Sequence, residues 1–204
     1  MPISLLVFHF KLFFNNIGYI CIDSEIGIDD KKIYDLGAVR CDGQVFHSAS
    51  IKDFRTFITG MEYICGHNII HHDMIFLKPH ISDDIKYKYI DTLFLSPLLF
   101  PKRPYHALLK YDKLQTDELN NPLNDAKKAE KLFYDEVNAF YALSSQRKQI
   151  YCCLLYQFEE FRGFFDYVDF VPYRSNAEKL IRSEFDGKIC SNADVALLIS
   201  RKAL

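Results

Sequence analysis

The stretch "YICIDSEIG", residues 19–27, decides how the rest of this 204-residue chain is interpreted. Its first four residues are apolar apart from the tyrosine hydroxyl and predict a strand buried in a sheet. Asp23 and Glu25 follow at the end of that strand, one residue apart. Two carboxylates on such neighbouring positions repel each other. The stretch therefore raises the question of which group elsewhere in the chain compensates their negative charge.

The composition predicts a folded domain with a substantial core. The chain is 49% hydrophobic and contains 18 Phe and 13 Tyr, which argues against disorder. Its length suits one domain, or one domain with an appendage. The formal net charge is −2, so no global attraction draws the protein to nucleic acid or to an anionic membrane, and polyanion binding requires a local patch.

The cysteines and the first residues indicate a cytoplasmic protein without a membrane segment. None of the six cysteines forms a C-x-x-C pair, which favours reduced thiols over a zinc site. The opening "MPISLLVFHFKLFF" is too short to span a bilayer and lacks the cationic start and cleavage site of a signal peptide. We expect residues 1–16 to form an extension that packs as an extra strand or helix; a misassigned start codon would also explain it.

Hydrophobic spacing predicts five strands, at 17–22, 32–40, 43–51, 62–68 and 87–91. Asp42-Gly43 is a strong hairpin signal between the second and third strands. Short helices are expected at 54–58 and 71–78, with another after residue 91 that is interrupted near Pro97. The pattern indicates an α/β protein with three antiparallel strands, then βα units, in one five-stranded mixed sheet flanked by helices.

The clearest helix begins at Pro122. Its apolar residues recur every three or four positions and therefore share one face, while Asn121 is a favourable N-cap and proline suits the first helical position. After residue 145 the strand signals stop. The expected organisation is an extension at 1–16, an α/β domain at 17–144 and a helical appendage at 145–204.

Two further acids are placed to join Asp23 and Glu25. Asp73 lies just beyond the fourth strand, and Asp125 lies in the first turn of the helix that begins at Pro122. The first and fourth strands are expected to be neighbours, and a helix packed across them would bring Asp125 to their ends. Divalent cations such as Mg²⁺ or Mn²⁺, which prefer oxygen ligands, would make this meeting favourable.

Three motifs in order resemble the DEDD-type 3′–5′ exonucleases of the DnaQ-like, RNase H-like superfamily. They are "ICIDSEIG" (20–27) followed by "YDLGAV" (34–39), "ICGHNIIHHDMIFL" (64–77) and "NNPLNDAKKAEKLF" (120–133). The resemblance covers about residues 17–142. It implies an RNase H-like sheet and a metal-dependent hydrolase that cleaves phosphodiester bonds at the 3′ end of nucleic acid, with DNA favoured.

The resemblance also implies roles for individual residues. Asp23 would bridge two Mg²⁺ or Mn²⁺ ions, with Glu25 and Asp125 on one ion and Asp73 on the other. The residues expected near the 3′ end of the substrate are His67, Asn68, Asn120 and His106.

One departure from the family pattern concerns the general base. The family carries His five residues before the last aspartate, or Tyr four residues before it, and this chain has Asn120 and Asn121 there. An amide cannot accept a proton at neutral pH, so the rate is expected to be low unless His106, His71 or His72 substitutes. The alternatives are a nucleic-acid-binding module of the same fold without turnover, and a structural domain with scattered surface acids.

Residues 78–113 carry seven Lys or Arg against four Asp, with aromatic residues interleaved. This composition suits contacts to the backbone and bases of a single strand, or simply a solvated surface. The partner expected from the resemblance is the 3′ end of single-stranded DNA. A helicase module in the same full-length chain is a further expectation, because the sequence is similar to nuclease portions that precede RecQ-like helicases.

Overall fold

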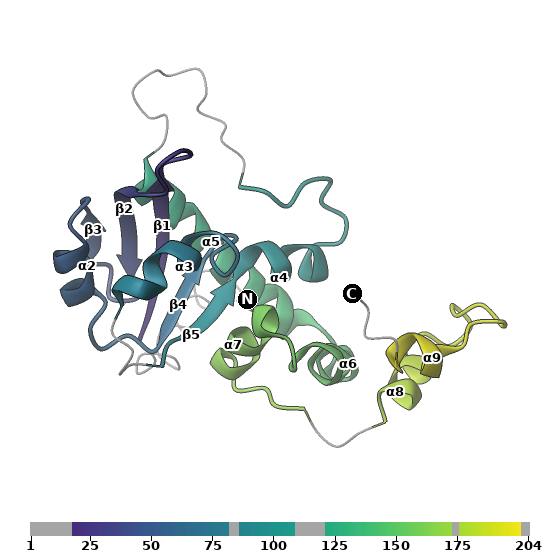
Figure 1. The fold of residues 1–204 in the computed structure, drawn as a ribbon. Coiled ribbons are helices and arrows are strands. Elements are labelled where there is room, and N and C mark those ends of the chain that lie inside the picture. Colours follow the sequence, from purple (N-terminus) through teal and green to yellow (C-terminus); the bar gives the residue numbers. More distant parts are fainter. Residues whose placement is uncertain (1–17, 82–85, 109–120, 173–175, 201–204) are drawn as a thin grey trace.

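A five-stranded mixed sheet organises the computed structural model, which describes residues 18–81, 86–108, 121–172 and 176–200 (Figure 1). The spatial order of the strands is β3-β2-β1-β4-β5. Neighbours β3, β2 and β1 are antiparallel, whereas β4 and β5 run parallel to β1. The strands are β1 (Tyr19–Ile26), β2 (Ile33–Arg40), β3 (Val45–His47), β4 (Tyr63–Gly66) and β5 (Lys88–Asp91). The sequence prediction of an α/β protein with a mixed sheet is therefore confirmed.

The first strand is longer than predicted. The apolar run ends at Ile22, but β1 continues through the acidic residues to Ile26. It does so because β2 supplies partners beyond that point, with Asp23 opposite Gly37 and Glu25 opposite Asp35. The pairing shifts only after Glu25. Backbone hydrogen bonds to a neighbouring strand, rather than side-chain hydropathy, thus determine where this strand ends.

The helices follow the predicted order, and one prediction about them is wrong. The expected break near Pro97 does not occur, because the proline lies within a continuous eight-residue helix. Among the described residues, no helix combines the length and apolar character needed to cross a bilayer. The helices are α2 (Ile51–Phe57), α3 (Asp73–Leu77), the 3₁₀ helix η1 (Lys78–His80), α4 (Thr92–Leu99), α5 (Pro122–Ala142), α6 (Ser145–Leu155), α7 (Glu159–Tyr167), α8 (Ala177–Glu184) and α9 (Val195–Ser200).

The sheet separates two hydrophobic cores, as the alternation of side chains along β1 requires. Tyr19 and Cys21 belong to the core that includes α5 and α7, whereas Ile20 and Ile22 belong to the core that includes α2 and α3. The six cysteines, all within the described residues, are free, as the sequence predicts. The sequence of β1 alone therefore specifies helices on both faces.

Helix α7 belongs to the same core as the sheet. Phe164, Phe165 and Tyr167 are buried with Tyr19 of β1, and the α7 backbone approaches β5 closely. A Cβ atom on Gly163 would lie 1.9 Å from the carbonyl oxygen of Tyr89, so only glycine fits at this contact. The predicted appendage from residue 145 onward thus begins with helices that complete the α/β domain.

Candidate functional site

The site is built where the second half of β1 meets the start of α5. Paired residues of antiparallel strands project to the same face, so Asp23 lies beside Gly37 on the α5 side of the sheet. A Cβ atom on Gly37 would lie 2.0 Å from the backbone nitrogen of Leu123. The missing side chain lets the first turn of α5 rest directly on β2. This contact brings the turn that carries Asp125 next to the strand that carries Asp23 and Glu25.

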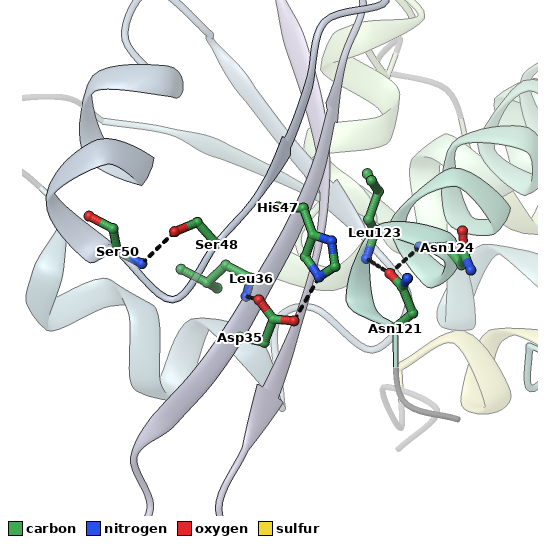
Figure 2. A network of polar contacts seen from close by, with 8 residues as sticks. All are labelled: Asp35, Leu36, His47, Ser48, Ser50, Asn121, Leu123 and Asn124. Carbon is green, nitrogen blue, oxygen red and sulfur yellow. Dashed lines mark hydrogen bonds and ion pairs between the residues drawn. The ribbon is translucent and has the colours of Figure 1, made fainter. Parts of the chain in front are cut away.

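The first turn of α5 is fixed by its own cap. The Asn121 side chain accepts hydrogen bonds from the backbone nitrogens of Leu123 (3.0 Å) and Asn124 (3.3 Å), as Figure 2 shows. Asp125 is only 9% exposed, and its Oδ1 accepts a hydrogen bond from Lys128 Nζ at 3.1 Å. The predicted N-cap is confirmed.

Asp73 approaches β1 from the opposite core. It is the first residue of α3 and is 1% exposed, and its Oδ1 accepts a 2.5 Å hydrogen bond from Ser24 Oγ. Ser24 lies between Asp23 and Glu25 in the chain. The short hydrogen bond therefore ties the third predicted carboxylate to the strand that carries the first two.

The pKa of His72 is shifted by three of the predicted carboxylates. Its Nδ1 lies 3.4 Å from Asp73 Oδ2, and this hydrogen-bonded contact is the main reason that its pKa is raised above the usual range. Burial opposes the shift, while the negative charges of Asp73, Asp23 and Glu25 add to it. Of the four predicted carboxylates, Asp73 contacts this imidazole directly, and Asp23 and Glu25 act on it through their charge.

The four acids lie on β1, α3 and α5 and do not form a coordination shell among the described residues. In the part of the chain that the structure describes, no three His, Cys, Asp or Glu side chains are arranged to hold a metal ion. Asp73 is turned to Ser24 and His72, and Asp125 is turned to Lys128. Contacts with Ser24, His72 and Lys128 offset part of the repulsion between the carboxylates. The oxygen donors themselves are of the kind that Mg²⁺ and Mn²⁺ prefer.

His67 has one ring nitrogen in a hydrogen bond and the other buried without a partner among the described residues. Its Nδ1 lies 2.9 Å from Thr92 Oγ1, and that hydroxyl donates its own proton to the carbonyl oxygen of Gly66. Nδ1 must therefore carry the proton, which leaves Nε2 as an acceptor; this buried atom has no partner among the described residues. Burial lowers the pKa of His67 to about 4, while Asp125 opposes that shift.

The loop after β4 is held by a buried carboxylate from β5. Asn68 adopts a left-handed conformation (φ = 64°), which asparagine tolerates well, and its backbone nitrogen donates to Asp91 Oδ1 at 2.9 Å. Ile70 N donates to the other oxygen of the same carboxylate at 3.1 Å. Asp91 also caps α4 through Leu93 N. One aspartate thus positions both predicted loop residues, His67 and Asn68.

The remaining predicted residues have other surroundings. His106 Nδ1 lies 2.9 Å from Ser96 Oγ of α4, and His71 Nε2 lies 3.1 Å from Glu160 Oε1 of α7. Each of these histidines therefore binds a helix other than α5. Asn120 and the extension at 1–16 lie outside the described residues.

Sequence reasoning missed a second polar pair beside α5. His47 Nε2 lies 2.7 Å from Asp35 Oδ2, and Asp35 Oδ1 accepts a hydrogen bond from Leu36 N (Figure 2). Asp35 is opposite Glu25, and His47 is opposite Gly37. The signal was present in the sequence, because the hairpin turn at Asp42-Gly43 fixes this register. The pair extends the row of titratable groups from β1 across β2 to β3.

Three of the basic residues expected beside the acids lie around the other end of the parallel strands instead. Lys88 pairs with Tyr63 at the start of β4, so it lies at the end of the parallel strands away from Asp23. Lys78 and Lys86 line the same region as Lys88. Arg103, which follows α4, packs its guanidinium 3.8 Å from the centre of the Phe100 ring.

In comparisons with known proteins, no protein-family model, no curated protein and no solved structure matches the chain.

Proposed function

We propose that this protein is a metal-dependent 3′–5′ exonuclease of the DEDD type with an RNase H-like fold, acting on the 3′ end of single-stranded DNA. The observation that carries the proposal is the contact of Gly37 with Leu123, because it sets the helix turn with Asp125 against the strand with Asp23 and Glu25. The strand order, with three antiparallel strands followed by two parallel ones, is compatible with that fold.

In this proposal Asp23, Glu25, Asp73 and Asp125 hold two Mg²⁺ or Mn²⁺ ions. Two carboxylates 4 Å apart repel by about 4 kcal/mol at an effective dielectric constant of about 20, and divalent ions reverse that sign. Bound ions would activate water and stabilise charge on the scissile phosphate. Ser24 keeps Asp73 directed toward β1, and Asp125 lies in the first turn of α5.

The histidine and asparagine side chains define what else the site can do. Asn121 accepts two backbone hydrogen bonds as a cap, so it is committed to structure and offers no base. His67 is unprotonated at neutral pH, but its low pKa makes it a weak base and its Nε2 is buried. The proposed enzyme therefore turns over slowly.

The test compares degradation of a single-stranded oligonucleotide by the wild type and by Asp125→Asn in Mn²⁺. We expect a loss of at least about a hundredfold, with a 3′-blocked oligonucleotide resisting the wild type. Asp135→Asn is the matched control, since it removes an exposed carboxylate from the same helix. Equal rates for wild type and Asp125→Asn, or wild-type degradation without divalent metal, would contradict the proposal.

A binding module of the same fold is the second candidate, and one observation favours it. The positions where the family carries its base are asparagines, and Asn121 is occupied as a helix cap. Binding of the oligonucleotide without product in Mg²⁺ and Mn²⁺ would support this reading. If the exonuclease proposal is right instead, Asn120→His should raise the rate.

A further inference from the structure

A second cavity lies far from the four carboxylates, between β5 and α7. Its volume is about 830 Å³, within the usual range for sites that bind small molecules. Lys88, at the start of β5, and Gly163 of α7 both line it. The carboxylates follow the other ends of the parallel strands, so the cavity is separate from the candidate active site.

The cavity carries an excess of positive charge. Four cationic side chains line it, against two carboxylates, Glu159 and Asp166. Lys88 contributes least, because its Nζ is paired with Glu62 Oε1 at 2.9 Å and lies 3.8 Å from Asp166 Oδ2. The other three cations are Lys78, Lys86 and Arg162.

These three cations are positioned but not neutralised. Arg162 donates hydrogen bonds to the backbone carbonyl oxygens of Tyr156 and Gln157, which fix the guanidinium without cancelling its charge. Lys78 and Lys86 are exposed, and neither forms an ion pair with a described residue. Among the described lining residues, Glu159 and Asp166 are the acids that oppose the cations, so the described lining keeps a positive excess that favours an anionic ligand.

Aromatic rings supply a second kind of contact. Tyr87 and Tyr89 line the same cavity; Tyr87 is buried and Tyr89 is half-buried. Tyrosine rings offer flat apolar surface to a base or sugar, while lysine and arginine suit phosphate oxygens. A cavity that combines these features in about 830 Å³ matches a ligand with both a phosphate group and a ring system.

We infer that the cavity between β5 and α7 is a binding site for an organic phosphate of nucleotide size. Phosphate oxygens contact Lys78, Lys86 and Arg162, and the ring system packs on the tyrosines. The site is independent of the proposed nuclease activity, because it uses none of the four carboxylates. A nucleotide bound there would link α7 to the strand that α7 covers.

The experiment measures binding of ATP, AMP and adenosine to the full chain by calorimetry, without divalent metal. The double variant Lys78→Gln/Lys86→Gln removes the two exposed charges, and Lys127→Gln/Lys131→Gln is the control with the same charge change on the exposed face of α5. We expect ATP to bind more tightly than AMP, adenosine to bind weakest, and the double variant to lose about tenfold or more in ATP affinity. The control should change by less than about twofold.

Several outcomes would overturn the inference. These are no measurable ATP binding to the wild type, equal affinity for adenosine and ATP, or the same loss in both double variants. Binding of an oligonucleotide together with failure to bind ATP would also overturn it, since that result indicates a polymer surface. Both pairs of lysines are exposed, so unchanged thermal unfolding is expected and would show that lost binding is not lost folding.

Discussion

Glu136 is a buried acid that the fold keeps uncharged. It lies in α5 with no exposed surface, and neither carboxyl oxygen has a hydrogen-bond partner among the described residues. Burial is the main cause that raises its pKa to about 10; the negative charge of Asp91 adds to the shift, and Arg103 opposes it. Burial also raises the pKa of Asp91, but three backbone N–H groups that donate to its carboxylate oppose that shift. At neutral pH, folding must therefore place a proton on Glu136.

The cost of that proton can be worked out from the ordinary pKa of 4.5. In the unfolded chain Glu136 is ionised at pH 7, and protonating it costs about 1.4 kcal/mol per pH unit above 4.5, or about 3 kcal/mol. The folded pKa is raised, so the full stability is present below pH 4.5 and is lost as the pH rises toward 10. Glu136→Gln needs no proton and keeps the shape, so it should stabilise the protein by about 3 kcal/mol at pH 7.

Urea unfolding of the wild type and Glu136→Gln at pH 4.5, 7 and 8.5 tests this reasoning. The gain should be near zero at pH 4.5 and should grow with pH, and at pH 7 it corresponds to a rise in Tm of about 6–12 °C. The difference between the two proteins is the relevant quantity, because His67 contributes an opposite pH dependence between about 4 and 6.5. Asp135→Asn serves as the exposed control. A variant that is no more stable at pH 7, or a gain that is independent of pH, would refute the argument.

Three further predictions concern the site. His67 has a lowered pKa, so its contribution to stability should increase by up to about 3 kcal/mol as the pH rises from 4 to 6.5, and His67→Gln should abolish that increment in urea titrations. Gly37→Ala should destabilise the protein by about 3 kcal/mol, because its Cβ would clash with the α5 backbone; chemical denaturation measures this, and wild-type stability would contradict the packing. Mn²⁺ at 100 times its dissociation constant should stabilise the wild type by about 2.7 kcal/mol, and an equal gain in Asp23→Asn would argue against binding at the carboxylates.

Local signals in the sequence predicted the elements that depend on local interactions. The hairpin at Asp42-Gly43 and the helix that starts after Asn121 are both present, because turn and cap chemistry act within a few residues. The continuation of β1 to Ile26 was missed, since it depends on β2 rather than on hydropathy. Pro97 was misjudged because its missing N–H removes only one hydrogen bond from a short helix.

Spacing and motif order put forward Asp23, Asp73 and Asp125 as candidate residues, and their role as a site stays a prediction. Their hydrogen-bond partners could not be predicted. Ser24 donates a hydrogen bond to Asp73, and Asp91 accepts one from the Asn68 backbone. Both contacts join residues many positions apart, so no local sequence pattern predicts them. Glu136, by contrast, falls between apolar residues on the buried face of α5, and its spacing could have revealed it.

The fit of Gly163 on the Tyr89 carbonyl has a consequence for solubility. β5 is the outermost strand on its side, and an uncovered outer strand offers unpaired backbone groups to another chain. Helix α7 shields that strand, while on the opposite side the outermost strand, β3, is only three residues long. A protein shortened before α7 would lose this shield and should self-associate through strand addition, even with its carboxylates intact.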